Sequence, residues 1–595
     1  MTTLRKPLAL LAIQFKRRPP GTGCTDGNSS PLSRKRTLLT KAHLRKCSYF
    51  FLPGVLFITI SVILGLRFGR PSTTKNDNPS GLPETTVDLG YAQYVGNALP
   101  GGTRQYLGVR YALPPTGDRR WRAPEEPLPN QGRQQAKTYG AICYPIGLAY
   151  PADGHDEDCL FANIWAPSVG NSSTKLPVWV FIQGGGYSTL ASWNWNGTDA
   201  VEKSGGKFLF INFNYRVGLF GFLAGGDVEA DGNLNVGLLD QRRLLQWVQT
   251  HISKEQFGGD PNHVIIHGVS AGAGSVAMHL AAYGGRNDNL FVGAMAQSAF
   301  FPAQPHVSDL EYQFDRVLDD AGCRDAQDKM KCLRGTSMGT LQRANDISPF
   351  PGRIHAPHFY WTPCVDGDLL VDYPSLLFKT GNFVQVPVLF GVCNDEGSVF
   401  ADEVETSADQ TSYLLDQYPH LNATHQETLA SLYPRQAPLP NHAPYFPSLS
   451  RAYGEATFSC PSASLLTAYS ASSSPAWGYR FAVPDADNTA AGLGIPHVFD
   501  APAVLGPGML PTAASYYTYN APVVPLVMAY FASFVRALDP NRHRAEGAPA
   551  WDTWGTTGSR VVFEGEGRMK VENAADNGMG ERCAFWDGVA ETTEQ

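Results

Sequence analysis

Charged residues are scarce in this sequence, and those present are unevenly distributed. Only 17% of the 595 residues are Asp, Glu, Lys or Arg, against 43% hydrophobic residues, a balance that indicates a packed globular chain. Lys and Arg are concentrated at the start: residues 1–46 hold eleven of them and one Asp, so the remaining residues carry a formal charge of −17 within a total of −7. An acidic body of this kind has no electrostatic reason to bind nucleic acid.

Long hydrophobic runs are also rare, and the exception lies near the N-terminus. Tyr49–Leu66 contains no charged residue, and a helix of this length reaches about 27 Å, close to the hydrocarbon thickness of a membrane. The basic residues before the run predict that the body is translocated. We therefore predict a basic cytosolic tail (1–46), a transmembrane signal anchor (47–67) and a flexible stalk (68–84). A cleaved signal peptide, which would give a secreted protein, and a misassigned first exon are open alternatives.

Cysteines and glycosylation signals agree with a lumenal or extracellular body. Eight cysteines follow the hydrophobic run, and an even number in a translocated protein is typical of disulfides, although spacing alone does not give the pairing. Three Asn-x-Ser/Thr sequons fall in the same region, at Asn171, Asn196 and Asn422. No cysteine pair has His or Cys neighbours at zinc-finger spacing, so we expect no metal site, and no cofactor is expected.

The body, residues 85–595, alternates apolar runs with helical periodicity, and it contains no internal repeat. Runs that fit buried strands lie at Val178–Ile182, Phe208–Phe213, Val264–Ile266, Val386–Val392 and Trp477–Val483. Between them are helical stretches such as Leu238–Thr250, whose leucines and valine share one face. The alternation predicts an α/β fold with a mostly parallel central sheet flanked by helices.

A glycine-flanked serine follows one of these runs. Gly268-Val269-Ser270-Ala271-Gly272 stands between Val264–Ile266 and a helix-like stretch from Ser275 to Ala282. The motif alone is weak, because about half a match is expected by chance in so glycine-rich a chain. Its setting of strand, sharp turn and helix is that of a nucleophile elbow, in which small residues let the backbone hold a serine clear of the sheet. The setting favours a serine hydrolase over a turn without chemistry.

Five segments lie in order around Ser270: Tyr106–Pro127, Asp156–Pro167, Asn214–Gly225, Asn235–Ile252 and Phe257–Val276. Together they closely resemble the type-B carboxylesterase/lipase family, the cholinesterase-like branch of the α/β-hydrolases. The resemblance runs from about Thr85 to Gly588. It implies the α/β-hydrolase fold and hydrolysis of carboxylic esters through an acyl-enzyme.

The resemblance also implies a catalytic triad. Ser270 becomes the nucleophile, and His497, in the loop Gly494–Gly506, becomes the general base. Glu396, in the segment Leu389–Phe400, becomes the acid that orients the histidine, although Asp395 stands beside it. The order Ser, Glu, His along the chain fits this fold.

Two further sets of residues follow from the same resemblance. The loop after Val178–Ile182 looks like the family's oxyanion-hole loop, with Gln183 where many relatives have His; its donors would be the backbone N–H groups of Gly185, Gly186 and Ala271. Three disulfides are implied: Cys143 with Cys159, Cys323 with Cys332, and Cys460 with Cys583. Cys364 and Cys393 are left over, and whether they pair is open.

Departures from the cholinesterases bear on the substrate. Cholinesterases have Glu immediately before the serine, where this chain has Val269, and a tryptophan in the loop between the first two cysteines, where it has only Tyr144 and Tyr150 as aromatics. We therefore expect small to medium neutral carboxylic esters as the small-molecule substrate. The alternatives are a lipase acting on acylglycerols and a catalytically silent, neuroligin-like binding protein; retention of the complete triad argues against the second.

Overall fold

One large mixed sheet organises the body. The computed structural model describes residues 85–168, 174–189, 195–509 and 512–595. Its strands are β1 (Thr85–Asp88), β2 (Gln93–Ala98), β3 (Thr103–Arg110), β4 (Arg133–Gln135), β5 (Phe161–Pro167), β6 (Leu176–Ile182), β7 (Leu209–Phe213), β8 (Gly259–Val269), β9 (Gly293–Gln297), β10 (Val388–Cys393), β11 (Ala476–Ala482), β12 (Ser559–Glu564) and β13 (Met569–Asn573).

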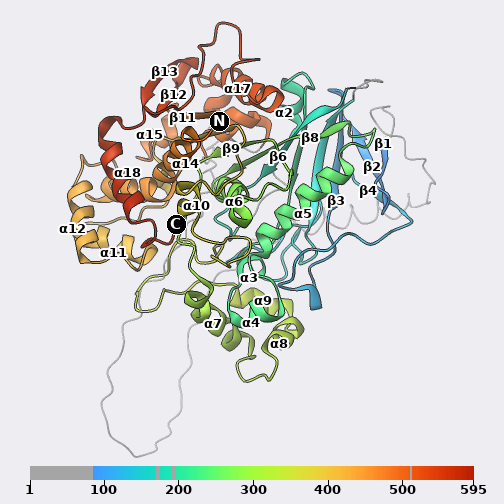
Figure 1. Ribbon diagram of the computed structural model, residues 1–595, viewed down its shortest axis with the longest axis horizontal. Helices are drawn as coiled ribbons and strands as arrows, with labels where there is room; N and C mark the ends of the chain where they lie inside the picture. Colours follow the sequence, from blue (N-terminus) through green and yellow to red (C-terminus); the bar gives the residue numbers. More distant parts are fainter. Residues whose placement is uncertain (1–84, 169–173, 190–194, 510–511) are drawn as a thin grey trace, which may run out of the picture. The chain divides into compact units, whose positions relative to one another are not determined.

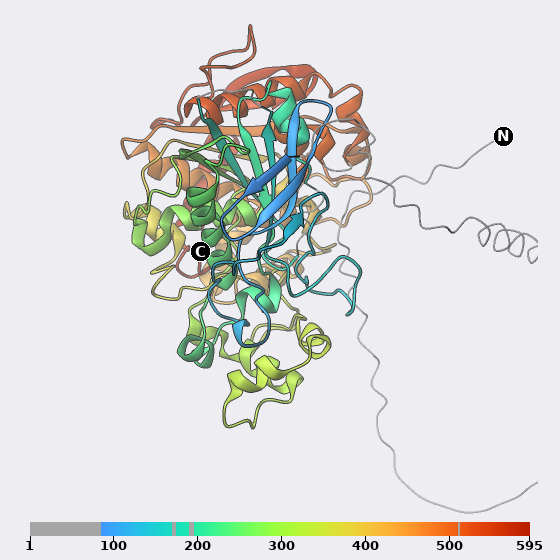
Figure 2. The same ribbon diagram turned by 90° about the vertical axis from the view of Figure 1, so that its right-hand side faces the viewer.

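The centre of the sheet is parallel. Within the described residues the strand order is β1-β2-β3-β5-β7-β6-β8-β9-β10-β11-β12-β13, with β4 paired to β2. All neighbours from β7 to β12 run parallel, whereas β1, β2, β3 and β5 at one end and β13 at the other pair antiparallel. Figure 2 is viewed from the end that carries the blue strands β1 to β3. The predicted mostly parallel central sheet is confirmed, and the five predicted apolar runs fall on β6, β7, β8, β10 and β11.

Helices follow most of the strands. They are α2 (Thr198–Lys203), α3 (Gly218–Phe222), α4 (Gly226–Asp231), α5 (Val236–His251), α6 (Ala271–Gly285), α7 (Glu311–Ala321), α8 (Lys329–Gly335), α9 (Met338–Ala344), α10 (Pro374–Lys379), α11 (Ser407–Gln417), α12 (Ala423–Leu432), α13 (Phe446–Gly454), α14 (Cys460–Ser470), α15 (Ala486–Ala490), α16 (Ala501–Leu505), α17 (Val523–Ala537) and α18 (Met579–Gly588). Short turns η4 (Glu396–Val399) and η5 (Glu455–Ser459) complete the elements that matter below.

Strand β6 shows why both faces of the sheet are covered. Successive side chains of a strand point to opposite faces, and every residue from Val178 to Ile182 is buried. Val178, Val180 and Ile182 join a core built with α5, α6 and α14, whereas Trp179 and Phe181 join a core built with α2, α16 and α17. A strand covered on both sides is apolar throughout rather than alternating.

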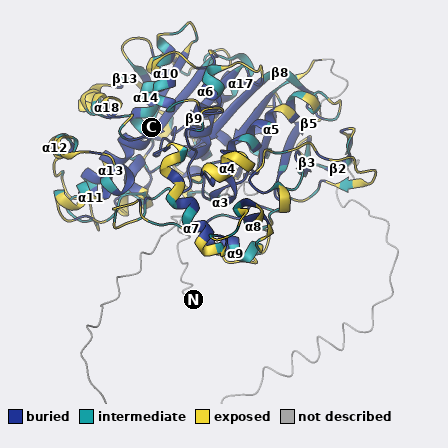
Figure 3. Cartoon of the chain, turned by 60° about the horizontal axis from the view of Figure 1, so that its bottom comes forward, coloured by how far each residue is buried: buried dark blue, intermediate teal, exposed yellow. Residues whose placement is uncertain are grey.

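A third core lies outside the sheet. It joins the connections after the central strands with α3, α4, α7, α9, α11, α12, α13 and α18. We call this assembly the helical layer; in Figure 1, α3, α4, α7, α8 and α9 gather below the sheet. Figure 3 shows that the strands are buried, while exposed residues lie on outer helices such as α12 and α4.

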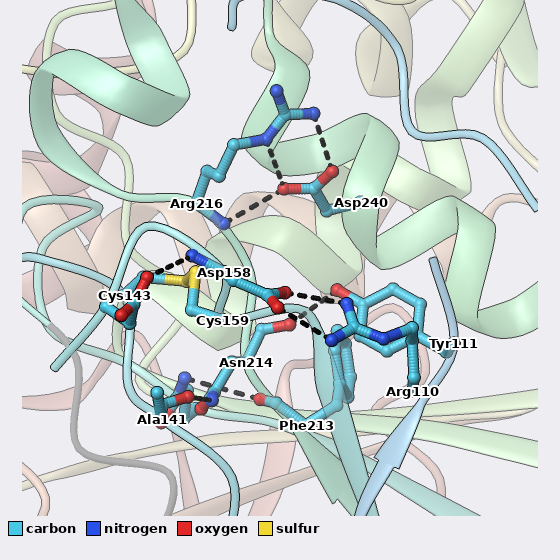
Figure 4. Close-up of a disulfide and its surroundings, with 12 residues drawn as sticks. Arg110, Tyr111, Ala141, Cys143, Asp158, Cys159, Phe213, Asn214, Arg216 and Asp240 are labelled. Atoms are coloured by element: carbon cyan, nitrogen blue, oxygen red, sulfur yellow. Dashed lines mark hydrogen bonds and ion pairs between the residues drawn. A yellow bond between two sulfur atoms is a disulfide. The ribbon is translucent and has the colours of Figure 1, made fainter. Parts of the chain in front are cut away.

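A buried ion pair joins the connection after β7 to helix α5. Arg216, in the connection after β7, donates from Nη2 to Asp240 Oδ1 at 2.7 Å, and its backbone N–H donates to Oδ2 at 3.0 Å (Figure 4). Both side chains are almost fully enclosed, at 3% and 0% exposure. Removing one partner would leave a buried charge uncompensated, so the pair fixes the connection that leads into α3.

Some predictions concern residues that are not described. The tail 1–46, the anchor 47–67, the stalk 68–84 and the sequon Asn171 all lie outside the described residues. Within the part of the chain that is described, no helix has the length and apolar character needed to cross a membrane. Residues from Leu82 to Gln595 form one unit in themselves.

Candidate active site

Ser270 occupies a sharp turn between β8 and α6. Its backbone has φ 58° and ψ −127°, a conformation that costs a non-glycine residue about 1–3 kcal/mol and that persists only where the surroundings enforce it. The surroundings here are glycines: a Cβ on Gly268 would lie 2.0 Å from the Gly272 oxygen, and one on Gly272 would lie 2.0 Å from the Ile182 oxygen. The turn therefore requires both glycines and leaves Ser270 partly exposed.

Glu396 and His497 are in direct contact. His497 lies in the loop between α15 and α16, and its Nδ1 donates to Glu396 Oε2. Glu396 follows β10 at the start of η4 and is only 2% exposed. Its other oxygen, Oε1, accepts the Ser298 hydroxyl at 2.7 Å and the Cys393 backbone N–H at 2.5 Å. A buried carboxylate with this many donors is fixed in orientation and holds the imidazole in one tautomer.

A short chain of contacts links Ser270 to this pair. The Ser270 backbone N–H donates to the Gln297 carbonyl at 2.9 Å, and the next residue, Ser298, is the one that holds Glu396. These residues follow β8, β9 and β10, three adjacent parallel strands whose carboxyl ends meet at one edge of the sheet. His497 Nε2 is buried and, among the described residues, has no hydrogen-bond partner. It is therefore available to accept a proton.

The glycine loop after β6 lies against Ser270. A Cβ on Gly184 would be 2.8 Å from Ser270 Cβ, so loop and turn are in close contact. Gly185 and Gly186 follow with φ of 115° and 60°. Within the described chain neither donates its backbone N–H to a protein acceptor, and Ala271 is the first residue of α6, where the N–H has no helical partner. Among the described residues, three backbone donors beside Ser270 thus have no acceptor.

Four phenylalanines form a wall at the site that the sequence reading missed. Phe400 and Phe458 pack on His497 with ring centroids 5.2 and 4.3 Å apart. Phe359 packs on Phe300 at 4.5 Å and on Phe400 at 5.7 Å. All four belong to the helical layer. No sequence signal could reveal them, because their segments are far apart along the chain.

The surroundings of Glu396 include two further groups that the sequence reading did not assign. Asp500 is fully buried and accepts the Tyr479 hydroxyl at 2.6 Å. Burial raises the pKa of Asp500, and it raises that of the Cys393 thiol well above its usual value; the charge of Glu396 acts in the same direction on both. Both groups are therefore driven toward their neutral forms beside the Glu396 carboxylate. The position of Asp500, three residues after His497, was the signal in the sequence that could have identified it as part of the site.

The structure contains three disulfides: Cys143–Cys159, Cys323–Cys332 and Cys460–Cys583. These are the pairs implied by the resemblance. Cys364 and Cys393 are both buried and free, and they belong to different cores, so they do not pair with each other.

Figure 4 shows the first disulfide beside the connection that follows β7. There Asn214 donates to the Ala141 carbonyl at 2.7 Å and accepts the Tyr111 hydroxyl on its own carbonyl at 2.5 Å. The contacts tie the disulfide loop to the sheet.

Two of the predicted glycosylation sequons, Asn196 and Asn422, lie on described residues. Asn422 is exposed and caps α12 through its side-chain oxygen, which accepts the His425 backbone N–H at 3.0 Å. Asn196 is half-buried, and its side-chain oxygen accepts both the backbone N–H and the hydroxyl of Thr198. Among the described residues no group of three or more His, Cys, Asp or Glu side chains is placed to hold a metal ion.

Comparison with known proteins gives one consistent result. Residues 84–586 match the model of the carboxylesterase family. The chain is 32% identical over 545 residues to secreted lipase 1 of Botryotinia fuckeliana, covering 83% of this chain and 92% of that protein. It is 29% identical to the acetylcholinesterase of Bungarus fasciatus, covering 82% and 83% of the two chains. The crystal structure of Aspergillus niger EstA superposes with a TM-score of 0.83 at 44% identity, covering 86% of this chain and 99% of EstA.

Proposed function

The chain belongs to the carboxylesterase family, and from that premise we propose that it is a serine ester hydrolase with Ser270, His497 and Glu396 as its nucleophile, base and acid. One observation carries the proposal: His497 donates from Nδ1 to a buried carboxylate, while its Nε2 is buried and unpaired among the described residues. That arrangement suits a general base and has no evident structural purpose. It also speaks against a catalytically silent binding protein.

The proposed reaction passes through an acyl-enzyme. Ser270 Oγ attacks the ester carbonyl carbon as its proton passes to His497 Nε2, and the carbonyl electron pair moves onto oxygen. The N–H groups of Gly185, Gly186 and Ala271 would hold that oxyanion; one such donor is typically worth about 2.7–4 kcal/mol in the transition state. Collapse expels the alkoxide, which takes the proton from His497. Water then repeats the sequence on the acyl-serine and releases the carboxylic acid.

We propose small to medium neutral esters as the substrates. The wall of four phenylalanines offers apolar contact, and Val269, buried before the nucleophile, offers no charge to attract a cation. Hydrolysis of acylglycerols is the second candidate, favoured by the 32% identity to a protein named as a secreted lipase. Comparing tributyrin with p-nitrophenyl butyrate, which share an acyl group, separates the two, because a lipase would gain on the acylglycerol.

Residues 49–66 would direct the body into the secretory pathway. The charge-free run and the basic residues before it support translocation. The likeness to a secreted protein supports release of the body, whereas the long basic leader supports an anchor. Cell fractionation distinguishes the outcomes: an anchored enzyme sediments with membranes and resists carbonate extraction, whereas a cleaved one is found in the medium.

Substitution of the triad tests the proposed mechanism. Ser270→Ala should abolish ester hydrolysis and labelling by a fluorophosphonate, and Glu396→Gln and His497→Ala should each lower kcat by about 10⁴-fold or more, without adding in combination. Ser473→Ala, at an exposed serine in the loop after α14, is the matched control and should behave as wild type. Equal labelling of wild type and Ser270→Ala would show that the nucleophile lies elsewhere.

A further inference from the structure

The loops that carry Glu396 and His497 are joined at one point. The Asp395 backbone N–H donates to the Ile495 carbonyl at 3.0 Å, and the Ile495 N–H donates back to the Asp395 side chain, at Oδ2, over 2.8 Å. A β-bridge pairs Asp395 with Pro496. The junction therefore lies one residue before the acid and two residues before the histidine.

The Asp395 side chain is held in place. The Asn394 side-chain amide donates to the same Oδ2 at 3.0 Å. The Asp395 carbonyl accepts the Ser398 backbone N–H at 3.1 Å and the Ser398 hydroxyl at 2.8 Å. Both the side chain and the backbone of Asp395 are thus fixed by contacts within its own loop, which makes the residue a firm support for the histidine loop.

The close approach of the two loops requires glycine at position 494. Its φ of +64° lies in the left-handed region, and a Cβ at this position would be 2.2 Å from Asp395 Oδ2. Glycine here lets the carboxylate reach the Ile495 N–H. The contact is specific to this pair of residues and is not a general feature of packing.

From these contacts we propose that Asp395 is a positioning residue that sets the histidine loop so that His497 Nδ1 meets Glu396, a role that rests on the esterase function proposed above. The far side of the loop is held separately, by Asp500 on Tyr479. Between the two anchors His497 lies outside regular helix and strand, so the loss of either one lets its backbone shift relative to Glu396. A displacement of about 1 Å in a catalytic group can lower the rate by about 10²-fold.

Two substitutions distinguish the role of Asp395 as a hydrogen-bond acceptor from the role of its charge. Asp395→Asn keeps an oxygen that can accept the Ile495 N–H, and Asp395→Ala removes it. With purified full-length protein and p-nitrophenyl butyrate, Asp395→Ala should lower kcat by about 10- to 100-fold with little change in KM, because the base is misplaced but substrate contacts are kept. Asp395→Asn should restore kcat to within about fivefold of wild type. A fluorophosphonate titration counts active sites, and the unfolding transition reports folding.

Two further variants serve as controls for the Asp395 measurements. Asp552→Ala, at an exposed aspartate, is the matched control and should match wild type. If Asp395→Ala does not fold, Gly494→Ala tests the same junction, since its methyl group displaces the carboxylate; kcat should fall by about tenfold or more. A wild-type kcat in Asp395→Ala, an Asn variant as slow as the Ala variant, or a wild-type kcat in Gly494→Ala overturns the proposal. Ester hydrolysis by Ser270→Ala would instead overturn the proposed function. It is measured in a different variant from those that test Asp395, so the two failures can be distinguished.

Discussion

Phe359 should limit the length of the acyl chain that the enzyme accepts. A Cβ on Gly186 would lie 2.2 Å from Phe359 Cε1, so the ring packs directly on one of the proposed oxyanion donors. The acyl chain and the alcohol are both attached to the same carbonyl carbon as that oxyanion, and we expect the acyl chain to be the group that leaves the reacting centre beside the ring. Phe359 is partly exposed and packs against the buried residues of the helical layer without being one of them, so Phe359→Ala should fold and open space for a longer chain.

The magnitude follows from the apolar surface that the opened space would bury. Each additional methylene is worth about 0.8 kcal/mol, or about fourfold in kcat/KM. Measured across p-nitrophenyl esters from acetate to octanoate, the ratio of Phe359→Ala to wild type should rise about fourfold per methylene over the two or three carbons that replace the ring. Phe359→Leu should be intermediate. An unchanged profile would refute the assignment, and a response confined to acetate esters of longer alcohols would place the ring on the alcohol side.

Three further outcomes can be tested. Burial, and to a smaller extent the charge of Asp309, raises the pKa of Glu594 to about 7. An acid whose folded pKa is raised gives stability at low pH that is lost as the pH rises, so Glu594→Gln should raise Tm relative to wild type at pH 8 and not at pH 4.5. Equal differences at both pH values would contradict this. A choline ester should show no advantage over its neutral 3,3-dimethylbutyl isostere, because Val269 supplies no charge; a preference above about tenfold would reveal an aromatic cage. Glycans should be found at Asn422 in material from a secretory host, and glycosidase treatment without a mobility shift would be inconsistent with translocation.

The parts of the fold and site that could be predicted depend on short-range signals. The runs Val178–Ile182 on β6 and Val264–Ile266 on β8 are apolar because both faces of the sheet are covered, and this pattern can be recognised in three to five residues. Gly268 can be recognised for a similar reason, since a Cβ there would meet Gly272 within the same turn, whereas the Cβ excluded at Gly272 would meet Ile182 on another strand. Glu396 and His497 were assigned only through resemblance, because no local pattern distinguishes them from other acids and histidines.

Long-range contacts account for what could not be predicted. Ser298 reaches Glu396 because β9 pairs in parallel with β10, a register that neither strand reveals by itself. Phe359 and Gly186 are even farther apart along the chain, and packing of the helical layer brings them together. The same reason left Cys364 and Cys393 undecided: both look like candidates for pairing in the sequence, and only the separation of the cores shows that each is a buried thiol.

The division of the site between the sheet edge and the helical layer bears on how the enzyme can change. At the sheet edge, Gly268 and Gly272 are confined by other backbone atoms, and Gly184 by the Val269 carbonyl and by Ser270 itself, so changes in other side chains cannot make room for substitutions there. The phenylalanine wall touches mostly other side chains, which can be exchanged in compensating groups. On the proposed assignments, reactivity and selectivity would belong to separable parts of the molecule. Laboratory evolution toward new esters should accumulate its changes in the wall while the glycines at the sheet edge stay invariant.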